Sequence, residues 1–274
     1  GRGGHSNYPP QQQAPDVGRN NINPLIFSMT HEYFKNKLGD YRQQKQKLIN
    51  NTFLWATMAI TSLEMMSVNE DSFKNQTKFK VPSTAKGKTV GRKPSEIRQI
   101  VKNAADKEIY FVLFTYIVAQ FEGFLVDTIT LVLNYDQRKL RVNVQGTENN
   151  KKVEVAELLD CANYDAVIDL IIDRQLGALF YAGPKKQVEY MEKVLSIKID
   201  ETLWDNWFES KATRDLIVHN SGIINKIYLE KAGTVARGKS GEKIVIDKKY
   251  FESTCVLIKS LVGKIETQAK KMII

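Results

Sequence analysis

The chain contains little cysteine and little histidine. Its 274 residues include two cysteines, Cys161 and Cys255, and three histidines. Two distant cysteines form neither a metal-binding nor a redox spacing, and their small number favours a reducing, cytoplasmic compartment. An imidazole-based metal site needs several ligands close together. We therefore expect no metal site and no cofactor.

Several catalytic and targeting signals are missing as well. There is no G-x-x-x-x-G-K-[ST] loop, which excludes a P-loop ATPase, and no G-x-S-x-G elbow of a serine hydrolase. The polar, Pro/Gln-rich N-terminus predicts no signal peptide. The most apolar stretch, residues 109–133, is interrupted by Gln120, Glu122, Gly123 and Asp127. Because carboxylates are costly inside a bilayer, we expect a buried core helix and no membrane partner.

Positive charge, in contrast, is in excess. The chain has 40 Lys and Arg against 31 Asp and Glu, a formal net charge of +9. Such an excess favours an anionic partner such as nucleic acid. Part of it falls in residues 67–95, where Pro and Gly interrupt regular structure. This segment predicts a basic loop that is either a solvated linker or an arm contacting RNA phosphates. The residues expected to make such contacts are Lys86, Lys88, Arg92 and Lys93.

Helical periodicity dominates the chain and predicts an all-α bundle. Residues 1–23 indicate a disordered tail or, at their start, a cloning remnant. Residues 24–94 are expected to form an N-terminal helical extension with the basic loop, and residues 95–274 the main helical domain. Glycines and two β-branched patches predict a small hairpin near residues 233–247.

The most informative stretch is residues 211–222, KATRDLIVHNSG. It places Arg214 five residues before His219, and Asp215 beside the arginine. A guanidinium suits phosphate oxygens, and an imidazole moves protons near neutral pH. RNA carries its own nucleophile, the 2′-hydroxyl. A base, an acid and a cation therefore suffice to leave a 2′,3′-cyclic phosphate and a 5′-hydroxyl.

The spacing of this pair poses a geometric problem. On a straight α-helix, residues five positions apart point about 140° away from each other. One solution is a helix that ends at His219, because Asn220-Ser221-Gly222 is a typical C-cap signal. The other is a two-fold dimer that brings the pair from both copies into one cleft.

The sequence leaves more than one role open for several acidic and aromatic residues outside the motif. Glu122 and Asp127 either orient the arginine of the motif or lie on an ordinary polar face. Trp204 and Trp207 follow helical periodicity and are expected in core or dimer packing rather than in stacking with bases. Tyr228 either donates to a phosphate or packs.

The run from Arg214 to Gly222 resembles the R-x4–6-H motif of the HEPN superfamily, in which a polar residue follows the arginine. Asp215 fills that polar position, and Asn220 with Gly222 resembles the HN-x-G ending of members linked to abortive infection. Residues 121–127, FEGFLVD, resemble a helix that often precedes the motif. The resemblance covers about residues 95–272 in pattern, and the motif is its specific part.

The resemblance implies an all-α bundle, often a homodimer with the motifs facing across a composite active site. Many members are metal-independent RNases that act as toxins or phage-defence effectors, so RNA, tRNA included, is the expected substrate. Carried over residue by residue, Arg214 and His219 are the catalytic pair and Asp215 is their polar assistant. We expect Asn220 and Lys211 to contact the RNA, and an antitoxin or regulatory protein is a further possible partner. A non-catalytic nucleotide-binding or structural dimerisation module is the alternative.

Overall fold

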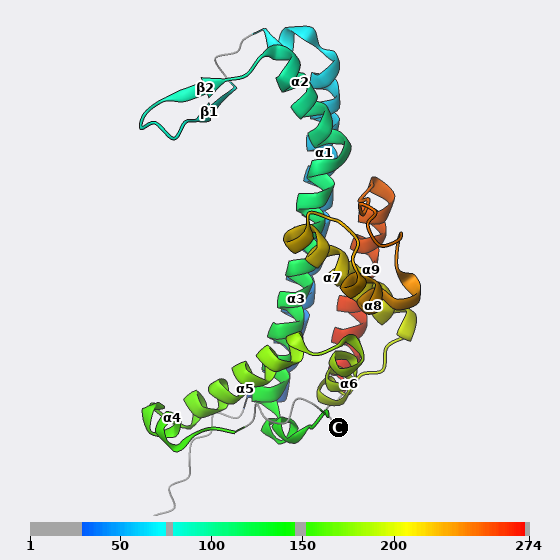
Figure 1. The fold of residues 1–274 in the computed structure, drawn as a ribbon. Helices are drawn as coiled ribbons and strands as arrows, with labels where there is room; N and C mark the ends of the chain where they lie inside the picture. Colours follow the sequence, from blue (N-terminus) through cyan, green and yellow to red (C-terminus); the bar gives the residue numbers. More distant parts are fainter. Residues whose placement is uncertain (1–28, 75–78, 146–151, 272–274) are drawn as a thin grey trace, which may run out of the picture.

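The computed structural model describes residues 29–74, 79–145 and 152–271. Within them the chain is mainly helical and contains one two-stranded sheet (Figure 1). The predicted all-α class with a small hairpin is confirmed. The predicted tail, residues 1–23, lies outside the described residues.

The predicted N-terminal extension contains one long helix, α1 (His31–Val68). Thr30 caps its start, because the Thr30 hydroxyl accepts a hydrogen bond from the backbone N–H of Tyr33 at 3.2 Å. The first half of α1 buries Phe34, Leu38 and Ile49 against α3 and α9. A 3-10 turn, η1 (Glu70–Phe73), follows it.

The second long helix runs antiparallel to α1 (Figure 1). It consists of α2 (Pro94–Asn103), a π turn η3 (Ala104–Glu108) and α3 (Ile109–Tyr135). Among the described residues, it is the one helix long and apolar enough to cross a bilayer, with a mean hydropathy of 1.8 in its most apolar window. In this fold α3 is the central core helix, in agreement with the prediction.

The hairpin lies elsewhere than predicted. Strands β1 (Lys80–Pro82) and β2 (Thr89–Gly91) pair antiparallel, with Val81 opposite Val90. The hairpin projects from the end of the α1–α2 pair, away from α7 (Figure 1). A small separate core of Phe73, Ile97 and Val101 lies at this end.

Residues 233–247 form no strand pair, so the predicted position of the hairpin is wrong. This segment contains a 3-10 turn, η6 (Gly233–Val235), and an isolated bridge between Ile223 and Lys243. The β-branched pattern has another cause. Ile244 packs against α7 and α8 and Ile246 joins the main core, while Val245 between them is exposed. The segment therefore pairs with the chain after α7 and not with itself.

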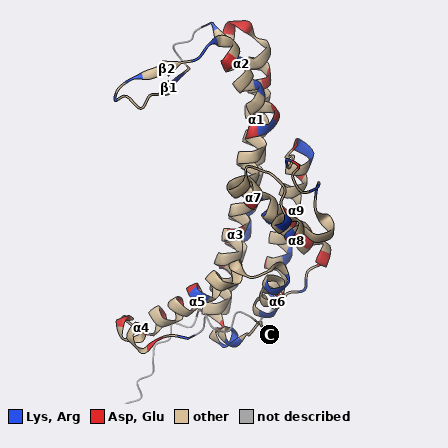
Figure 2. Ribbon diagram, viewed as in Figure 1, with Lys and Arg blue, Asp and Glu red and all other residues tan. Residues whose placement is uncertain are grey.

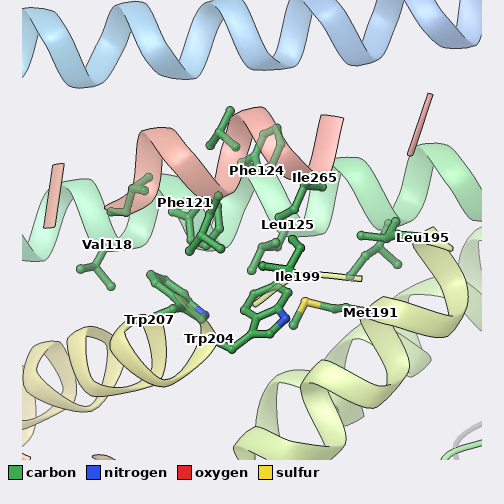
Figure 3. Packing of buried hydrophobic residues seen from close by; sticks show 14 of the residues in the cluster. Val118, Phe121, Phe124, Leu125, Met191, Leu195, Ile199, Trp204, Trp207 and Ile265 are labelled. Atoms are coloured by element: carbon green, nitrogen blue, oxygen red, sulfur yellow. The ribbon is translucent and has the colours of Figure 1, made fainter. Parts of the chain in front are cut away.

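The remaining helices are η4 (Gln137–Arg141), α4 (Val155–Asp160), α5 (Tyr164–Tyr181), α6 (Pro184–Leu195), α7 (Glu201–Asn220), α8 (Lys226–Ala232) and α9 (Lys248–Ala269). Of these, α5, α6, α7 and α9 contribute buried residues to the core around α3, whereas α4 buries none. Trp204 and Trp207 are buried as predicted, and Figure 3 shows both among the core side chains. The Trp207 ring meets Phe121 edge-on at 4.5 Å between centroids. Aromatic packing thus fixes α7, which carries the motif, on α3.

Candidate functional site

The predicted motif lines a cleft of about 720 Å³ between α7, α8 and the α5–α6 turn. Helix α3 adds Glu122, and α8 adds Tyr228 and Lys231. The polar residues from α7 are Lys211, Arg214, Asp215, His219 and Asn220. The structure therefore brings together in one cavity the predicted catalytic pair, its polar neighbour and two of the expected RNA contacts.

The end of α7 explains how residues five positions apart reach one cleft. Helix α7 stops at Asn220, and Ser221 and Gly222 follow in the left-handed conformation, with φ values of 51° and 75°. The N–H of Gly222 donates to the carbonyl of Leu216 at 2.9 Å, which closes the last turn. His219 thus lies on the terminal turn with an exposed side chain. Of the two arrangements open from sequence, a helix that ends beside His219 is the one seen within this single chain.

The turn after His219 is held by a distant segment. The N–H of Ile224 donates to the Glu242 carbonyl, and the N–H of Gly241 donates back to Ile224, both at 2.8 Å. The N–H of Ile244 donates to Gly222, also at 2.8 Å. Asn220 is tied locally, because its amide donates to the carbonyl of Ile223 at 2.5 Å. These bonds fix the backbone that carries the imidazole.

Arg214 is oriented by Glu122 of α3. The Arg214 Nη2 atom donates to Glu122 Oε2, while Lys211 Nζ lies 3.2 Å from the other oxygen, Oε1. The side chains of Arg214 and Glu122 are 21% and 19% exposed. Glu122 is thus the carboxylate that meets the motif, whereas Asp127 lies exposed on α3.

Asp215 links two cationic groups on the other side of Arg214. Its Oδ1 lies 3.4 Å from Arg214 Nε, and its Oδ2 accepts from Lys231 Nζ at 3.3 Å. Arg214 Nε is buried and, among the described residues, makes no hydrogen bond. The guanidinium is therefore held by carboxylates at two positions, and its Nη1 atom makes no hydrogen bond within the described part of the chain.

Lys211 lines the cleft, and its side chain is only 12% exposed. Burial lowers the pKa of Lys211, and the nearby Glu122 carboxylate partly opposes that shift. Its Nζ also lies 5.1 Å from the centroid of the Phe180 ring and 3.5 Å from Gln187 Oε1. An RNA phosphate at Lys211 would therefore share its ammonium group with Glu122, Phe180 and Gln187.

The other expected RNA contacts lie outside the cleft. Lys86, Lys88, Arg92 and Lys93 are exposed on and beside the hairpin. Within residues 29–74, 79–145 and 152–271, none of their side chains forms an ion pair. Figure 2 shows basic and no acidic positions along this hairpin. The structure does not bring these residues together with Arg214 and His219.

A buried polar network on the far side of α7 is missing from the sequence-based prediction. Glu209 is 4% exposed and accepts hydrogen bonds from Thr213 at 2.7 Å, Tyr228 at 2.8 Å, Tyr250 at 2.6 Å and Arg237 at 3.0 Å. We call these five residues the Glu209 network. The only local signal is an acidic residue inside the apolar stripe of α7, and it does not reveal the distant arginine and tyrosines.

The network settles the role of Tyr228. Its hydroxyl donates to Glu209 and accepts from the N–H of Arg237 at 2.9 Å, so the side chain packs instead of pointing freely at a ligand. Burial, reinforced by the Glu209 carboxylate, raises the pKa of Tyr228 to about 12. Arg237 also lies over the ring of Tyr250, 3.3 Å from its centroid. The network thereby fastens the segment around Arg237, which leads to residues 241–244, to α7.

Among the described residues, no group of three or more His, Cys, Asp or Glu side chains is placed to hold a metal ion. Comparison of the chain with models of protein families, with curated proteins and with solved structures gives no match.

Proposed function

We propose that the chain is a metal-independent endoribonuclease that cleaves RNA in the cleft at the end of α7. The observation that carries this proposal is that Arg214 and His219 line the same cleft, with the imidazole exposed to a ligand. The net charge of +9 and the resemblance of residues 214–222 to the HEPN motif add support. A cytoplasmic role as a toxin or anti-phage effector follows from that resemblance.

The chemistry uses groups that RNA and the cleft supply. A base removes the 2′-hydroxyl proton, the 2′-oxygen bonds to phosphorus, and the 5′-oxygen leaves with a proton from an acid. His219 is one of these two proton carriers. Arg214 stabilises the negative charge that develops on the phosphate oxygens. A second imidazole comes from a second copy of the chain in a two-fold dimer, which duplicates every group of the cleft.

Glu122 and Asp215 have positioning roles in this scheme. A guanidinium that is hydrogen-bonded on one edge keeps its remaining N–H groups in a fixed plane, and this order does not have to be created when the phosphate arrives. The same pairing has a cost, because each carboxylate reduces the positive potential that the phosphate meets. Lys211 and Lys231 counter it, since each lies beside one of the two carboxylates.

Because the carboxylates lower the positive potential at Arg214, one alternative is favoured: a non-catalytic nucleic-acid- or nucleotide-binding module. In such a module the pairing of Arg214 with Glu122 holds α7 on α3, and the cleft binds a phosphate without breaking a bond. This alternative predicts RNA binding that survives His219→Ala and no cleavage by either protein.

The test is a cleavage assay with total RNA and, separately, tRNA in the presence of EDTA. We expect the wild type to leave 2′,3′-cyclic phosphate ends and His219→Ala to leave the RNA intact. His31→Ala is the matched control, because His31 lies at the start of α1 beside Tyr135, outside the cleft. Equal cleavage by wild type and His219→Ala overturns the assignment. RNA binding without cleavage by the wild type selects the binding module.

A further inference from the structure

Tyr181 is the most exposed large apolar side chain in the described part of the chain. It is the last residue of α5, and 95% of its accessible surface is open to solvent. It is also a lining residue of the cleft that contains Arg214 and His219. Across the same cleft, Ile227 of α8 is 60% exposed. The cleft thus has exposed apolar groups on its walls in addition to its charges.

The backbone that carries Tyr181 is held in place. Gln187, which is 4% exposed, donates its amide to the carbonyl of Ala182 at 2.7 Å and to that of Phe180 at 3.4 Å. The N–H of Ala182 continues the helical hydrogen bonds of α5 at 3.1 Å. The phenol ring therefore projects from a fixed turn and not from a long loop.

The same glutamine connects this turn to the arginine of the motif. Its Oε1 lies 3.5 Å from Lys211 Nζ, and Lys211 in turn lies 3.2 Å from Glu122, the carboxylate that holds Arg214. A continuous set of polar contacts thus sets the position of Tyr181 relative to Arg214. A fixed distance between Tyr181 and Arg214 allows one ligand to contact both side chains without rearrangement of the cleft.

We propose that Tyr181 is a stacking subsite for a nucleobase next to the phosphate that Arg214 binds. A nucleotide combines an anionic group with a flat, largely apolar ring, and this cleft offers a cation and an exposed aromatic face in one cavity. Stacking on an aromatic side chain needs a base that is not already stacked in a duplex. The substrate class is therefore unpaired RNA. This inference rests on the proposed function for its RNA ligand, but it requires no cleavage.

The test is a binding measurement with single-stranded RNA whose riboses carry 2′-O-methyl groups, so that no 2′-hydroxyl can attack. We expect Tyr181→Ala to raise the Kd about 10-fold, because one base stack is lost. Tyr181→Trp restores the affinity, since indole also stacks. Tyr164→Ala is the matched control: Tyr164 is a 59% exposed tyrosine at the other end of α5 and outside the cleft. We expect its Kd to equal that of the wild type.

Two further probes show whether the stacked nucleobase belongs to single-stranded RNA, to duplex RNA or to a free nucleotide. A hairpin duplex of the same composition is expected to bind more weakly and to be insensitive to Tyr181→Ala. Adenosine monophosphate, added as a competitor of the single-stranded RNA, shows whether a free nucleotide is enough to occupy the Tyr181 subsite. Tight, Tyr181-dependent binding of the nucleotide with none of the RNA overturns the RNA part of the proposal.

The subsite itself is overturned if Tyr181→Ala leaves the Kd for single strands unchanged, or if the wild type binds neither probe. Because the methylated RNA cannot be cleaved, these outcomes are independent of the nuclease assay. Tyr181-dependent binding together with no cleavage of ordinary RNA would overturn the proposed reaction and leave the subsite standing.

Discussion

The cleft and the hairpin use the same cationic residue types in opposite ways. Around α7 four cationic side chains have a carboxylate partner, namely Lys211, Arg214, Lys231 and Arg237. On and beside the hairpin, Lys86, Lys88, Arg92 and Lys93 are exposed and make no ion pair with the rest of the described chain. Paired, half-buried cations give fixed geometry, whereas free surface cations give long-range attraction that salt screens. The chain thus separates cations held in fixed ion pairs from cations that are free at the surface, and under the proposed function the first group positions a phosphate and the second attracts it.

The largest effect is expected where paired charge is most deeply buried. Glu209→Leu removes the common acceptor of the Glu209 network and leaves Arg237, which is 30% exposed, without its carboxylate. We expect a loss of about 3–5 kcal/mol in the free energy of unfolding, measured by urea denaturation. Glu230→Gln is the control, because its exposed ion pair with Lys226 at 3.6 Å is expected to contribute less than about 1 kcal/mol. If both variants lost a similar free energy of unfolding, the buried ion pair would stabilise the fold no more than the exposed one does.

A smaller, pH-dependent effect is expected where α1 meets α9. Burial alone would raise the pKa of Glu266, but hydrogen bonds from Lys270 and Arg42 outweigh burial and lower the pKa below its ordinary value of 4.5. A carboxyl group with a lowered pKa in the folded state stabilises the fold above pH 4.5, and this contribution disappears as the pH falls through the lowered value. Glu266→Gln is therefore expected to cost about 1–3 kcal/mol at pH 7.

The measurement is the free energy of unfolding of wild type and Glu266→Gln from pH 7 down to acid. We expect the gap between the two proteins to narrow below pH 4.5. Glu189→Gln serves as the control, since Glu189 is 49% exposed in an ion pair with Lys193 on the surface. A gap that stays constant with pH would show that the carboxylate charge of Glu266 does not stabilise the fold.

The smallest effect on stability, and a clear one on binding, is expected at the hairpin. Replacing Lys86, Lys88, Arg92 and Lys93 together by alanine removes exposed charges without partners, so the free energy of unfolding should change by less than about 0.5 kcal/mol. If these residues contact RNA, the slope of log affinity against log salt becomes shallower by up to about 3, since each neutralised phosphate of a single strand contributes about 0.7. An unchanged slope would assign the hairpin to the solvated-linker interpretation.

Local sequence patterns were sufficient for the helices and for part of the cleft. Helical periodicity predicted the all-α class, and the Asn220-Ser221-Gly222 signal indicated a helix end beside His219 as one of two solutions. These features depend on residues within a few turns of one another. Because α7 ends there, Arg214 and His219 can reach the same cleft, and in the structure both residues line it.

Long-range pairing was not predictable in the same way. Glu122 lies 92 positions before Arg214, and nothing in its own stretch distinguishes it from Asp127 as the partner. The Glu209 network joins four separate parts of the chain. The hairpin was misplaced for a related reason: alternating β-branched residues report burial on alternate sides, and at Ile244 and Ile246 that burial comes from packing on helices.

The π turn between α2 and α3 has a consequence for insertions and deletions. The buried positions run at intervals of four through Ile97, Val101 and Ala105, and then skip five to Tyr110. The wide turn, in which the N–H of Ile109 donates to the carbonyl of Ala104, accommodates that extra residue and keeps the apolar face continuous. The turn thus holds one residue more than the same length of regular α-helix would. A chain one residue shorter here would form an ordinary α-helix with the same buried face, so this is the point in the core where a deletion would restore regularity.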